Sequence, residues 1–295
     1  MTNIATDPVY SPIKLRIAPL LLARQMMRLA TVRGRFRVGN WLAHRVLPKR
    51  KVLLPNIVGK PMVFDLNNIH EVSMFYDLFA EELTEIFRKT LRKNDVFFDC
   101  GANVGYFTLL GAGLVGPQGR AFSIDANPYC INRIKESCSF GDNPHVELLH
   151  GAVSGEPGEM TFNIANDPMY SSVSDLNQTS FATTTQSITV PVQVFDDLIQ
   201  KYELSATGAI RLVKIDIEGA EVDMLKGAHS MLSNQVADFL YFELHQQQLK
   251  AKGQSTEEVD EIVTSYPYKK VWQPSKAWVV YQSESSLSKD GPVWN

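Results

Sequence analysis

The sequence predicts an α/β fold with a doubly wound, mostly parallel sheet and a basic helical extension in front of it. Three observations support this fold class. Strand-like and helix-like segments alternate from residue 95 onward, a glycine-containing loop follows the first strand, and two β-rich runs near the end of the chain predict an antiparallel hairpin. We expect the extension over residues 1–64 and one domain over residues 65–295, with its core at 95–284.

Each expected element follows from the spacing of its apolar residues. Short apolar runs bounded by turn residues predict buried parallel strands. These runs are VFFDC (96–100), RAFSID (120–125), VELLHGAV (146–153), IRLVKIDIEG (210–219) and FLYFELH (239–245). The expected helices cover residues 106–116, 128–140, 220–232 and 256–264. Two alternating runs, 159–164 and 187–194, and the hairpin strands 269–273 and 277–282 complete the pattern.

Charge is distributed unevenly along the chain. Residues 1–64 hold 12 basic residues and one acid, for a net charge of +11, whereas the remainder holds 17 basic and 31 acidic residues, for −14. Basic residues interleaved with leucine and methionine predict an amphipathic helix that either docks on the domain or contacts anionic lipid. No apolar run reaches the length of about 18 residues that a spanning helix needs.

The three cysteines bear on whether the chain has disulfides or a zinc site. They form no C-x-x-C pair and leave an odd residue over, which argues against a disulfide framework and against a zinc site. We therefore expect a reducing, cytoplasmic setting. The basic N-terminus leaves a peripheral membrane contact open as the alternative to docking on the domain. An Arg-rich N-terminus also resembles a transit peptide, although Pro12, Pro19 and Gly34 interrupt any long helix.

The loop after the first strand carries an acid as well as glycines. Gly101 and Gly105 allow a tight turn and close approach of a ligand to the following helix. Asp99 would repel the pyrophosphate of a dinucleotide, but would suit a ligand with an ammonium group and a ribose. S-adenosylmethionine has that composition. Asp125, at the end of the next strand, has the spacing of an acid that binds ribose hydroxyls, which NAD enzymes share.

A second group of charges lies in LVKIDIEGAE, residues 212–221. Strand alternation places Lys214, Asp216 and Glu218 on one side of an otherwise apolar strand, where charges are costly unless paired or functional. Asp216 is our first candidate for a general base or acceptor-orienting group, with Lys214 holding it ionised. His245 is the second candidate, because imidazole titrates near neutrality.

These stretches together resemble one enzyme family. DCGANVGYFT, IDANP and VKIDIEGAE, in this order and spacing, are similar to the FkbM family of S-adenosylmethionine-dependent methyltransferases over about residues 71–245. The resemblance implies a seven-stranded, Rossmann-like methyltransferase fold and methyl transfer to oxygen, commonly a hydroxyl of a sugar, glycolipid or natural product. It also implies that Asp99, Gly101, Asn103 and Gly105 hold the amino-acid end of the cofactor and Asp125 the ribose. The family often has glutamate at the position of Asp125.

The remaining expectations complete the site. Cofactor contacts are also expected at Ala126, Gly151 and Ala152, and catalytic roles at Asp216, His245 and Lys214. Acceptor contacts are expected at Glu218, Glu243 and Tyr170, the last within a polar segment, 165–186, that would form a lid or an ordinary loop. Three carboxylates, those of Asp216, Glu218 and Glu243, could gather a divalent ion, but their spacing does not demand one, so we expect no metal.

Other functions stay open on the sequence alone. A nicotinamide-dependent oxidoreductase is disfavoured by Asp99 and by the lack of G-x-G-x-x-G, and a nucleotide-binding protein without turnover is disfavoured by the intact acids. Nucleic-acid methylation would use the basic N-terminus, but residues 65–295 are acidic. We expect a small-molecule, glycan or lipid-linked acceptor and no nucleic acid.

Overall fold

The computed structural model describes residues 22, 24–27, 41, 51–55, 60–141, 143, 145–166, 171, 183–291 and 293. The chain divides into two compact units, Met1–Val52 with Phe64–Phe79 and Leu53–Val63 with Ala80–Asn295. The expected boundary at residue 64 stays a prediction. The division into two units does not follow it, since Phe64–Phe79 belongs to the same unit as Met1–Val52.

Little of the basic extension belongs to the described residues. Residues 22, 24–27 and 41 are helical, and Arg24 forms an ion pair of 2.6 Å with Asp77. The strands β1 (Lys51–Pro55) and β2 (Pro61–Asp65) form a two-stranded sheet, and α3 (Ile69–Phe75) begins where the Asn68 side chain accepts two backbone N–H groups. The rest of the predicted basic helix lies outside the described residues. Within the described ranges, no helix combines the length and the apolar character needed to cross a bilayer.

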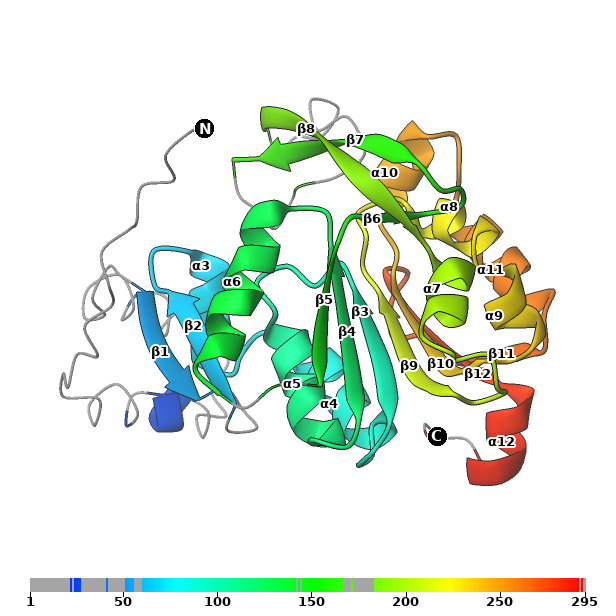
Figure 1. Cartoon of the computed structure of the whole chain (residues 1–295), viewed down its shortest axis with the longest axis horizontal. Helices are drawn as coiled ribbons and strands as arrows, with labels where there is room; N and C mark the ends of the chain where they lie inside the picture. The colour runs from blue at the N-terminus through cyan, green and yellow to red at the C-terminus, as the bar shows by residue number, and fades with distance from the viewer. Residues whose placement is uncertain are drawn as a thin grey trace. The chain divides into compact units, whose positions relative to one another are not determined.

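A seven-stranded mixed sheet forms the centre of the larger unit (Figure 1). Its strand order is β11-β12-β10-β9-β3-β4-β5, with parallel pairing from β10 to β5 and antiparallel pairing of β12 with both its neighbours. The strands are β3 (Val96–Cys100), β4 (Arg120–Asp125), β5 (Val146–His150), β9 (Ile210–Ile215), β10 (Ala237–Glu243), β11 (Tyr268–Trp272) and β12 (Trp278–Ser283). The predicted doubly wound, mixed sheet is confirmed.

Helices cover both faces of this sheet (Figure 1). On one side lie α4 (Glu81–Thr90), α5 (Tyr106–Val115) and α6 (Pro128–Ser139). On the other lie α7 (Phe195–Lys201), α8 (Glu221–Lys226), α9 (His229–Ser233) and α11 (Thr256–Thr264). The short helices α10 (Gln246–Ala251) and α12 (Glu284–Asp290) follow β10 and β12. Because both faces are covered, the central strands are apolar on both sides.

Aromatic side chains hold the central strands to the helices. Phe98 of β3 stacks on Phe122 of β4, with ring centroids 4.3 Å apart. Its ring centroid also lies 5.0 Å from that of Phe195, at the start of α7. All three rings are fully buried. Aromatic pairs of this kind contribute about 0.5–1.5 kcal/mol beyond the area that they bury. These contacts join β3 and β4 to each other and to α7.

One predicted strand is divided in two. The run 146–153 was expected as a single strand, but β5 ends at His150 and β6 (Ala152–Ser154) pairs with another sheet. Gly151, at φ 151°, turns the chain between them, a conformation open to glycine. The second sheet has the order β6-β8-β7, in which β7 (Glu159–Ala165) and β8 (Thr184–Val194) form the antiparallel pair predicted from their alternation.

Two other predicted elements differ from expectation. The helix expected over 220–232 is divided into α8 and α9 at Gly227, where an added Cβ would lie 2.7 Å from the Ser154 carbonyl. The strand expected over 210–219 ends at Ile215, since Glu218 and Gly219 adopt positive φ values of 52° and 90°. Glu218 therefore lies on a turn and not on the strand.

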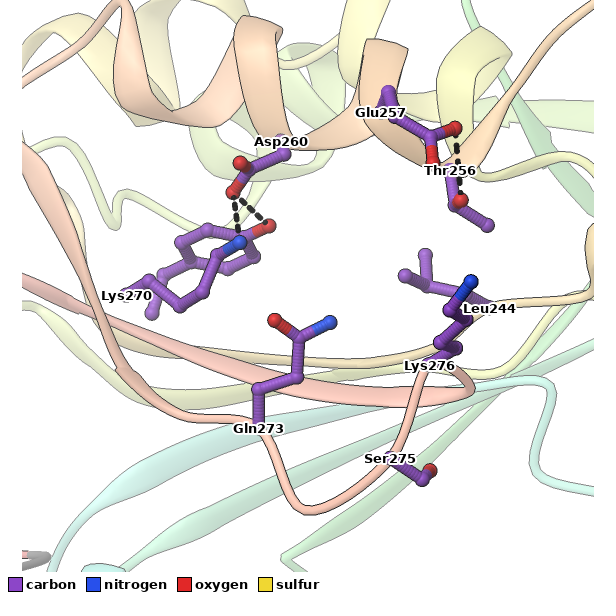
Figure 2. Close-up of a pocket in the computed structure, with 9 residues that line it drawn as sticks. Leu244, Thr256, Glu257, Asp260, Lys270, Gln273, Ser275 and Lys276 are labelled. Atoms are coloured by element: carbon purple, nitrogen blue, oxygen red, sulfur yellow. Dashed lines mark hydrogen bonds and ion pairs between the residues drawn. The ribbon is translucent and has the colours of Figure 1, made fainter.

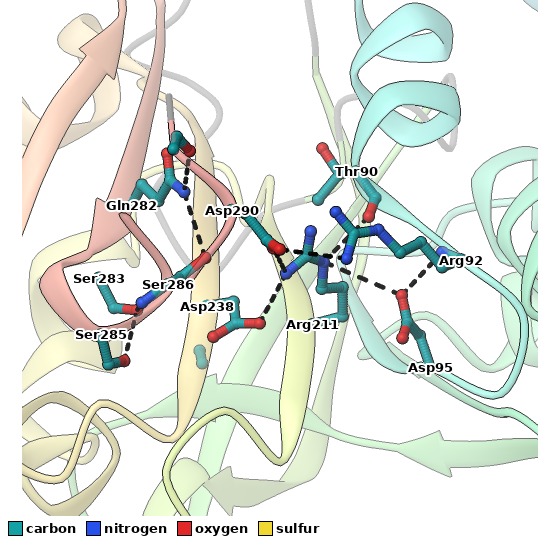
Figure 3. A network of polar contacts seen from close by, with 12 residues as sticks. Thr90, Arg92, Asp95, Arg211, Asp238, Gln282, Ser283, Ser285, Ser286 and Asp290 are labelled. Atoms are coloured by element: carbon teal, nitrogen blue, oxygen red, sulfur yellow. Dashed lines mark hydrogen bonds and ion pairs between the residues drawn. The ribbon is translucent and has the colours of Figure 1, made fainter. Parts of the chain in front are cut away.

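A polar network ties the C-terminal helix to the amino ends of the central strands (Figure 3). The Arg211 guanidinium of β9 donates to Asp238 of β10 at 2.8 Å and to the Thr90 carbonyl at 3.0 Å, and it pairs with Asp290 of α12 at 2.7 Å. Arg92 also reaches Asp290, at 3.3 Å. Open α/β sheets bind ligands at the carboxyl ends of their strands, whereas this network lies at the amino ends. Its role is therefore structural.

Arg211→Met is expected to lower the free energy of unfolding by about 1.5–3 kcal/mol, the range for hydrogen bonds to charged groups. The methionine retains the volume of the aliphatic stem but leaves Asp238 without its donor. Urea unfolding followed by circular dichroism measures the change. Arg88→Met, which removes an exposed pair with Glu85 on α4, serves as the control and should cost less than about 0.5 kcal/mol. Equal effects of the two substitutions would contradict a structural role for the network.

Candidate functional site

The loop between β3 and α5 is shaped by close contact with the end of β9. Gly101 has φ 77°, and a Cβ on it would lie 1.7 Å from the Asp216 carbonyl oxygen, so only glycine fits. Gly105, at φ 87°, precedes α5 and faces Ile134, which an added Cβ would meet at 2.7 Å. The predicted turn is thus present. At Gly101, however, the group that approaches closely is the backbone carbonyl of Asp216 and not a ligand.

Lys214 of β9 contacts three oxygen atoms at or next to this loop. Its ammonium group is 3.0 Å from Asp99 Oδ1, 3.2 Å from Asp216 Oδ2 and 3.0 Å from the Gly101 carbonyl, which uses its three donors. Burial lowers the pKa of Lys214, but the two carboxylates outweigh burial and raise it above its usual value. The lysine is therefore a fixed positive charge that holds the loop to the end of β9.

Asp99 is in a different position from the one expected for a cofactor ligand. Its side chain is 0% exposed, pairs with Lys214 and accepts a hydrogen bond of 2.7 Å from Thr108. Thr108 in turn lies 2.9 Å from the hydroxyl of Ser123. Because no part of the carboxylate reaches the surface, we revise its expected role from direct cofactor contact to support of the loop.

Asp125 lies at the carboxyl end of β4, as its position in the sequence predicts. Its two carboxylate oxygens accept backbone N–H groups from Asn103 and Asn127, each at 2.7 Å. Burial raises the pKa of Asp125 to about 7, although these two donors lower it. The acid therefore braces the loop after β3, through Asn103, against the loop after β4.

The remaining expected cofactor residues lie around the same strand end. Ala126 follows Asp125, and the Gly151 N–H donates to the Asp125 carbonyl at 3.0 Å. Ala126 and Ala152 are both buried and belong to a small cluster with Phe162 of β7. The structure brings these residues together beside Asp125, with the two alanines packed into the second sheet.

A cluster of acids surrounds His245, just beyond β9 and β10. His245 Nε2 lies 3.6 Å from Asp216 Oδ1 and 3.5 Å from Glu218 Oε1, while its Nδ1 lies 2.8 Å from Glu221 Oε1. Asp216 is 27% exposed, whereas Glu221 is 0% exposed. Gln248 donates to Glu218 Oε2 at 2.9 Å. The cluster joins residues 216–221 to the residues that follow β10.

The electrostatics of the cluster bear on which group accepts a proton. Burial lowers the pKa of His245, but the hydrogen bond to Glu221 and the charges of Glu218 and Asp216 raise it to about 10. An imidazole with this pKa is protonated at neutral pH and is a poor general base, contrary to our second sequence-based candidate. Burial also raises the pKa values of Glu218 and Glu243 to about 7, with Asp216 contributing to both.

The acceptor residues expected from the sequence are placed only in part. Glu218 and Glu243 both lie near Asp216, whereas Tyr170 and most of the predicted lid lie outside the described residues. Sequence analysis assigned no functional role to Glu221 or Gln248. The burial of Glu221, at 0% exposure, is what marks it, and the sequence alone does not reveal that burial.

A cavity of about 450 Å³ lies beside the end of β10 (Figure 2). Most of its lining residues are polar in type, and they come from α11, the β11–β12 hairpin and the residue before His245. The lining residues are Leu244, Thr256, Glu257, Asp260, Lys270, Gln273, Ser275, Lys276 and Tyr281. The Leu244 N–H donates to the Ala277 carbonyl at 2.6 Å, which places the hairpin turn at the carboxyl edge of the sheet. The cavity and the cluster therefore share one edge.

Two cations of the cavity differ in their partners. Lys270 pairs with Asp260 at 2.9 Å, and Tyr281 donates to the same carboxylate, also at 2.9 Å. Lys276, in contrast, is exposed and has no ion pair with any residue that the structure describes. Its charge interacts with that of Glu257, which also lines the cavity, and its exposed ammonium group can reach an anionic ligand.

The fold and the site together define a class of protein. A glycine loop after the first strand of a doubly wound sheet, with acids at the ends of the neighbouring strands, is the architecture of α/β proteins that bind nucleotide-like ligands at this edge. Residues 99–270, more than half of the chain, match the Methyltransferase FkbM domain. The chain belongs to the FkbM methyltransferase family.

Three known proteins illustrate the likeness. The hexuronic acid methyltransferase AglP of Haloferax volcanii is 24% identical over 210 residues, which cover 71% of this chain and 81% of AglP. A crystal structure of methyltransferase FkbM from Methylobacillus flagellatus KT has 13% identity and a TM-score of 0.41, covering 90% of this chain and 59% of that one. A SAM-dependent methyltransferase from Aquifex aeolicus has 13% identity and a TM-score of 0.39, covering 68% and 87%.

Proposed function

We propose that the protein is an S-adenosylmethionine-dependent methyltransferase that acts on an oxygen of a sugar, most simply a hydroxyl. One observation carries the proposal. Asp216 is a partly exposed carboxylate at the end of the central strand β9, held by Lys214 and packed through its backbone against the glycine loop. Membership of the FkbM family supports methyl transfer, and the name of AglP supports a sugar acceptor.

The cofactor would lie across the ends of β3 and β4. Asp125 would accept hydrogen bonds from the ribose hydroxyls, and the loop of Gly101, Asn103 and Gly105 would face the amino-acid end. Ala126, Gly151 and Ala152 would bound the site on the β5 side. Asp99 contributes indirectly, since its contact with Lys214 holds the loop in place.

The proposed reaction needs alignment and one proton acceptor. S-adenosylmethionine, when bound, would supply an electrophilic methyl group, to which the acceptor oxygen would bond as the C–S electron pair returned to sulfur. The hydroxyl proton passes to the side chain of Asp216, which lies 3.2 Å from the Lys214 ammonium group. Positioning of the two reactants supplies much of the rate enhancement, and general-base catalysis adds about 10² to 10⁴.

The cavity beside His245 is our candidate for the acceptor site. Its hydroxyl, amide and carboxylate groups suit the hydroxyls of a sugar, and Lys276 suits a carboxylate such as that of a hexuronic acid. We propose that an acceptor bound there extends to Asp216 around the end of β10, where Leu244 of the cavity precedes His245 of the cluster. Glu218 and Glu243 would border the same acceptor.

The affinity for adenosine is expected to rise by about 10-fold as the pH rises through about 7, because ribose hydroxyls bind better to the ionised form of Asp125. The sign follows from the raised pKa: below it the carboxyl is protonated and loses acceptor strength. Isothermal titration with adenosine, which lacks the titratable amino-acid end of the cofactor, measures the effect. Asp125→Asn should bind more weakly and without this pH dependence; a wild-type affinity that is flat between about pH 5.5 and 8 would contradict the ribose assignment.

Methyl transfer to defined acceptors tests the function. The full chain is incubated with methyl-tritiated S-adenosylmethionine and a panel of neutral glycosides and hexuronic acid glycosides. We expect label in a sugar and in a form stable to mild alkali, as a methyl ether is, with Lys276→Ala weakening the use of hexuronic acids only. Label released by alkali would assign the carboxylate as the acceptor. Label in RNA or DNA, or in no acceptor, would contradict the proposal.

The cellular setting remains part of the proposal. The acidic charge of residues 65–295 favours a small-molecule, glycan or lipid-linked acceptor over nucleic acid. A cytoplasmic location and a peripheral contact of the basic N-terminus with anionic lipid fit the charge distribution. Binding of the full chain to vesicles with and without anionic lipid measures that contact.

A further inference from the structure

The cluster around His245 has the arrangement of a cation site. One ligand atom from each of Asp216, Glu218 and His245 lies within 4.8 Å of the other two. The two carboxylate oxygens are 3.6 and 3.5 Å from His245 Nε2. Divalent cations bind such ligands at about 2.0–2.6 Å, which places neighbouring ligand atoms about 3 to 4 Å apart. A small adjustment of side chains would therefore complete three of the ligand positions.

The imidazole is held in the orientation that a metal ligand needs. His245 Nδ1 donates to Glu221 Oε1 at 2.8 Å, which turns Nε2 toward Asp216 and Glu218. Metal-binding histidines commonly have a carboxylate on the other ring nitrogen. Glu221 is fully buried, and its Oε2 has no hydrogen-bond partner among the described residues. A buried acid that serves only to cap α8 would not need to face the histidine.

The balance of charge also favours a cation. Four carboxylates, those of Asp216, Glu218, Glu221 and Glu243, interact with His245 or with one another. Against them stand two positive groups: Lys214, which contacts Asp216 but is shared with Asp99, and the His245 ring, so the acids still outnumber the cations. Buried charges of one sign are costly unless they are paired or bind a metal. The backbone of Glu218, at φ 52°, is in a conformation that non-glycine residues seldom adopt, and it brings this acid into the cluster.

We infer that Asp216, Glu218 and His245 bind one divalent cation, with Glu221 as the carboxylate that orients the histidine. Two carboxylates and one imidazole are a ligand set suited to Mn²⁺ and, with water in the remaining positions, to Mg²⁺; the cation would displace the proton from His245 Nε2. The site departs from the sequence-based expectation of no metal, because His245 is far from Asp216 and Glu218 in the chain and meets them only when β9 and β10 pair. Binding of the cation does not depend on the proposed function. Its effect on catalysis rests on that function: a hydroxyl coordinated to the cation would release its proton to Asp216 more readily.

Titration of the metal-stripped full chain with Mn²⁺ alone tests the site, with free Mn²⁺ followed by electron paramagnetic resonance. We expect one bound ion per chain that Mg²⁺ displaces. His245→Gln and Glu218→Gln should each weaken Mn²⁺ binding by at least about 10-fold, and Glu221→Gln by about 10-fold, as outer-shell carboxylates do. His229→Gln, an exposed histidine on α9 that contacts Tyr266, is the matched control and should bind as the wild type does.

Adenosine binding and thermal melting show which variants are folded. A folded His245→Gln protein that binds Mn²⁺ as tightly as the wild type would overturn the site, and so would a wild-type chain that binds neither Mn²⁺ nor Mg²⁺ at millimolar concentration. Because the readout is metal binding, a chain that binds Mn²⁺ but transfers no methyl group would contradict the proposed function and leave the cation site supported.

Discussion

Asp216→Asn is expected to lower the turnover of methyl transfer by about 10² to 10⁴, the usual contribution of general-base catalysis. The amide has the size of the carboxylate but cannot take the acceptor's proton. Asp216 lies beside Lys214 but is 27% exposed, so the loss of its charge should cost little stability. Cofactor affinity should stay nearly unchanged, because Asp125 and the glycine loop are intact. Single-turnover transfer and thermal melting on one preparation measure both effects.

The outcome at Asp216 separates chemistry from structure. If the carboxylate only neutralised Lys214, the asparagine variant would lose several kcal/mol of stability while the folded fraction kept its turnover. Such a destabilised but active variant would contradict the proposed base. His245 would not replace it readily, since its raised pKa keeps the ring protonated at neutral pH. The acceptor proton would then have to pass to Glu218 or Glu243.

Lys214→Met is expected to lower the free energy of unfolding by about 3–5 kcal/mol, the cost of removing one partner from a buried ion pair. Methionine fills the space of the lysine stem, so the loss arises from charge. It leaves the fully buried Asp99 with only the hydroxyl of Thr108, and it removes the donor to the Gly101 carbonyl. Urea unfolding at neutral pH, with the midpoint and the slope both fitted, measures the change.

A double variant tests the physical reason. Asp99→Asn in the Lys214→Met background removes the uncompensated charge, and it should recover about half or more of the lost stability. Asp99→Asn alone should cost less than Lys214→Met, because the lysine keeps Asp216 and the Gly101 carbonyl as partners. If the double variant were no more stable than Lys214→Met, the loss would come from packing and not from the buried aspartate.

The strands and the order of elements were predictable because local patterns specify them. Each run between residues 96 and 283 that was predicted as a sheet strand contains one, because a buried parallel strand is apolar on both faces and is bounded by turn residues. The glycine loop and Asp125 were placed by the same reasoning. Errors arose at Gly151 and Gly227, which divide elements that look continuous in the sequence. Both glycines lie where an added Cβ would meet a carbonyl from a distant part of the chain, a contact that the sequence does not reveal.

The amino-acid sequence by itself determined the fold class, the loop after the first strand and the acids at the strand ends, because these depend on periodicity and on residue type. Tertiary structure decided how the charges pair. Asp99 and Lys214 are separated by more than 100 positions, yet they face each other across β3 and β9 and bury one another's charge. His245 meets Glu221 only because β9 and β10 are neighbours in the sheet. Interactions of this kind depend on distances of a few ångströms between strand ends, and no local pattern in a sequence specifies such distances.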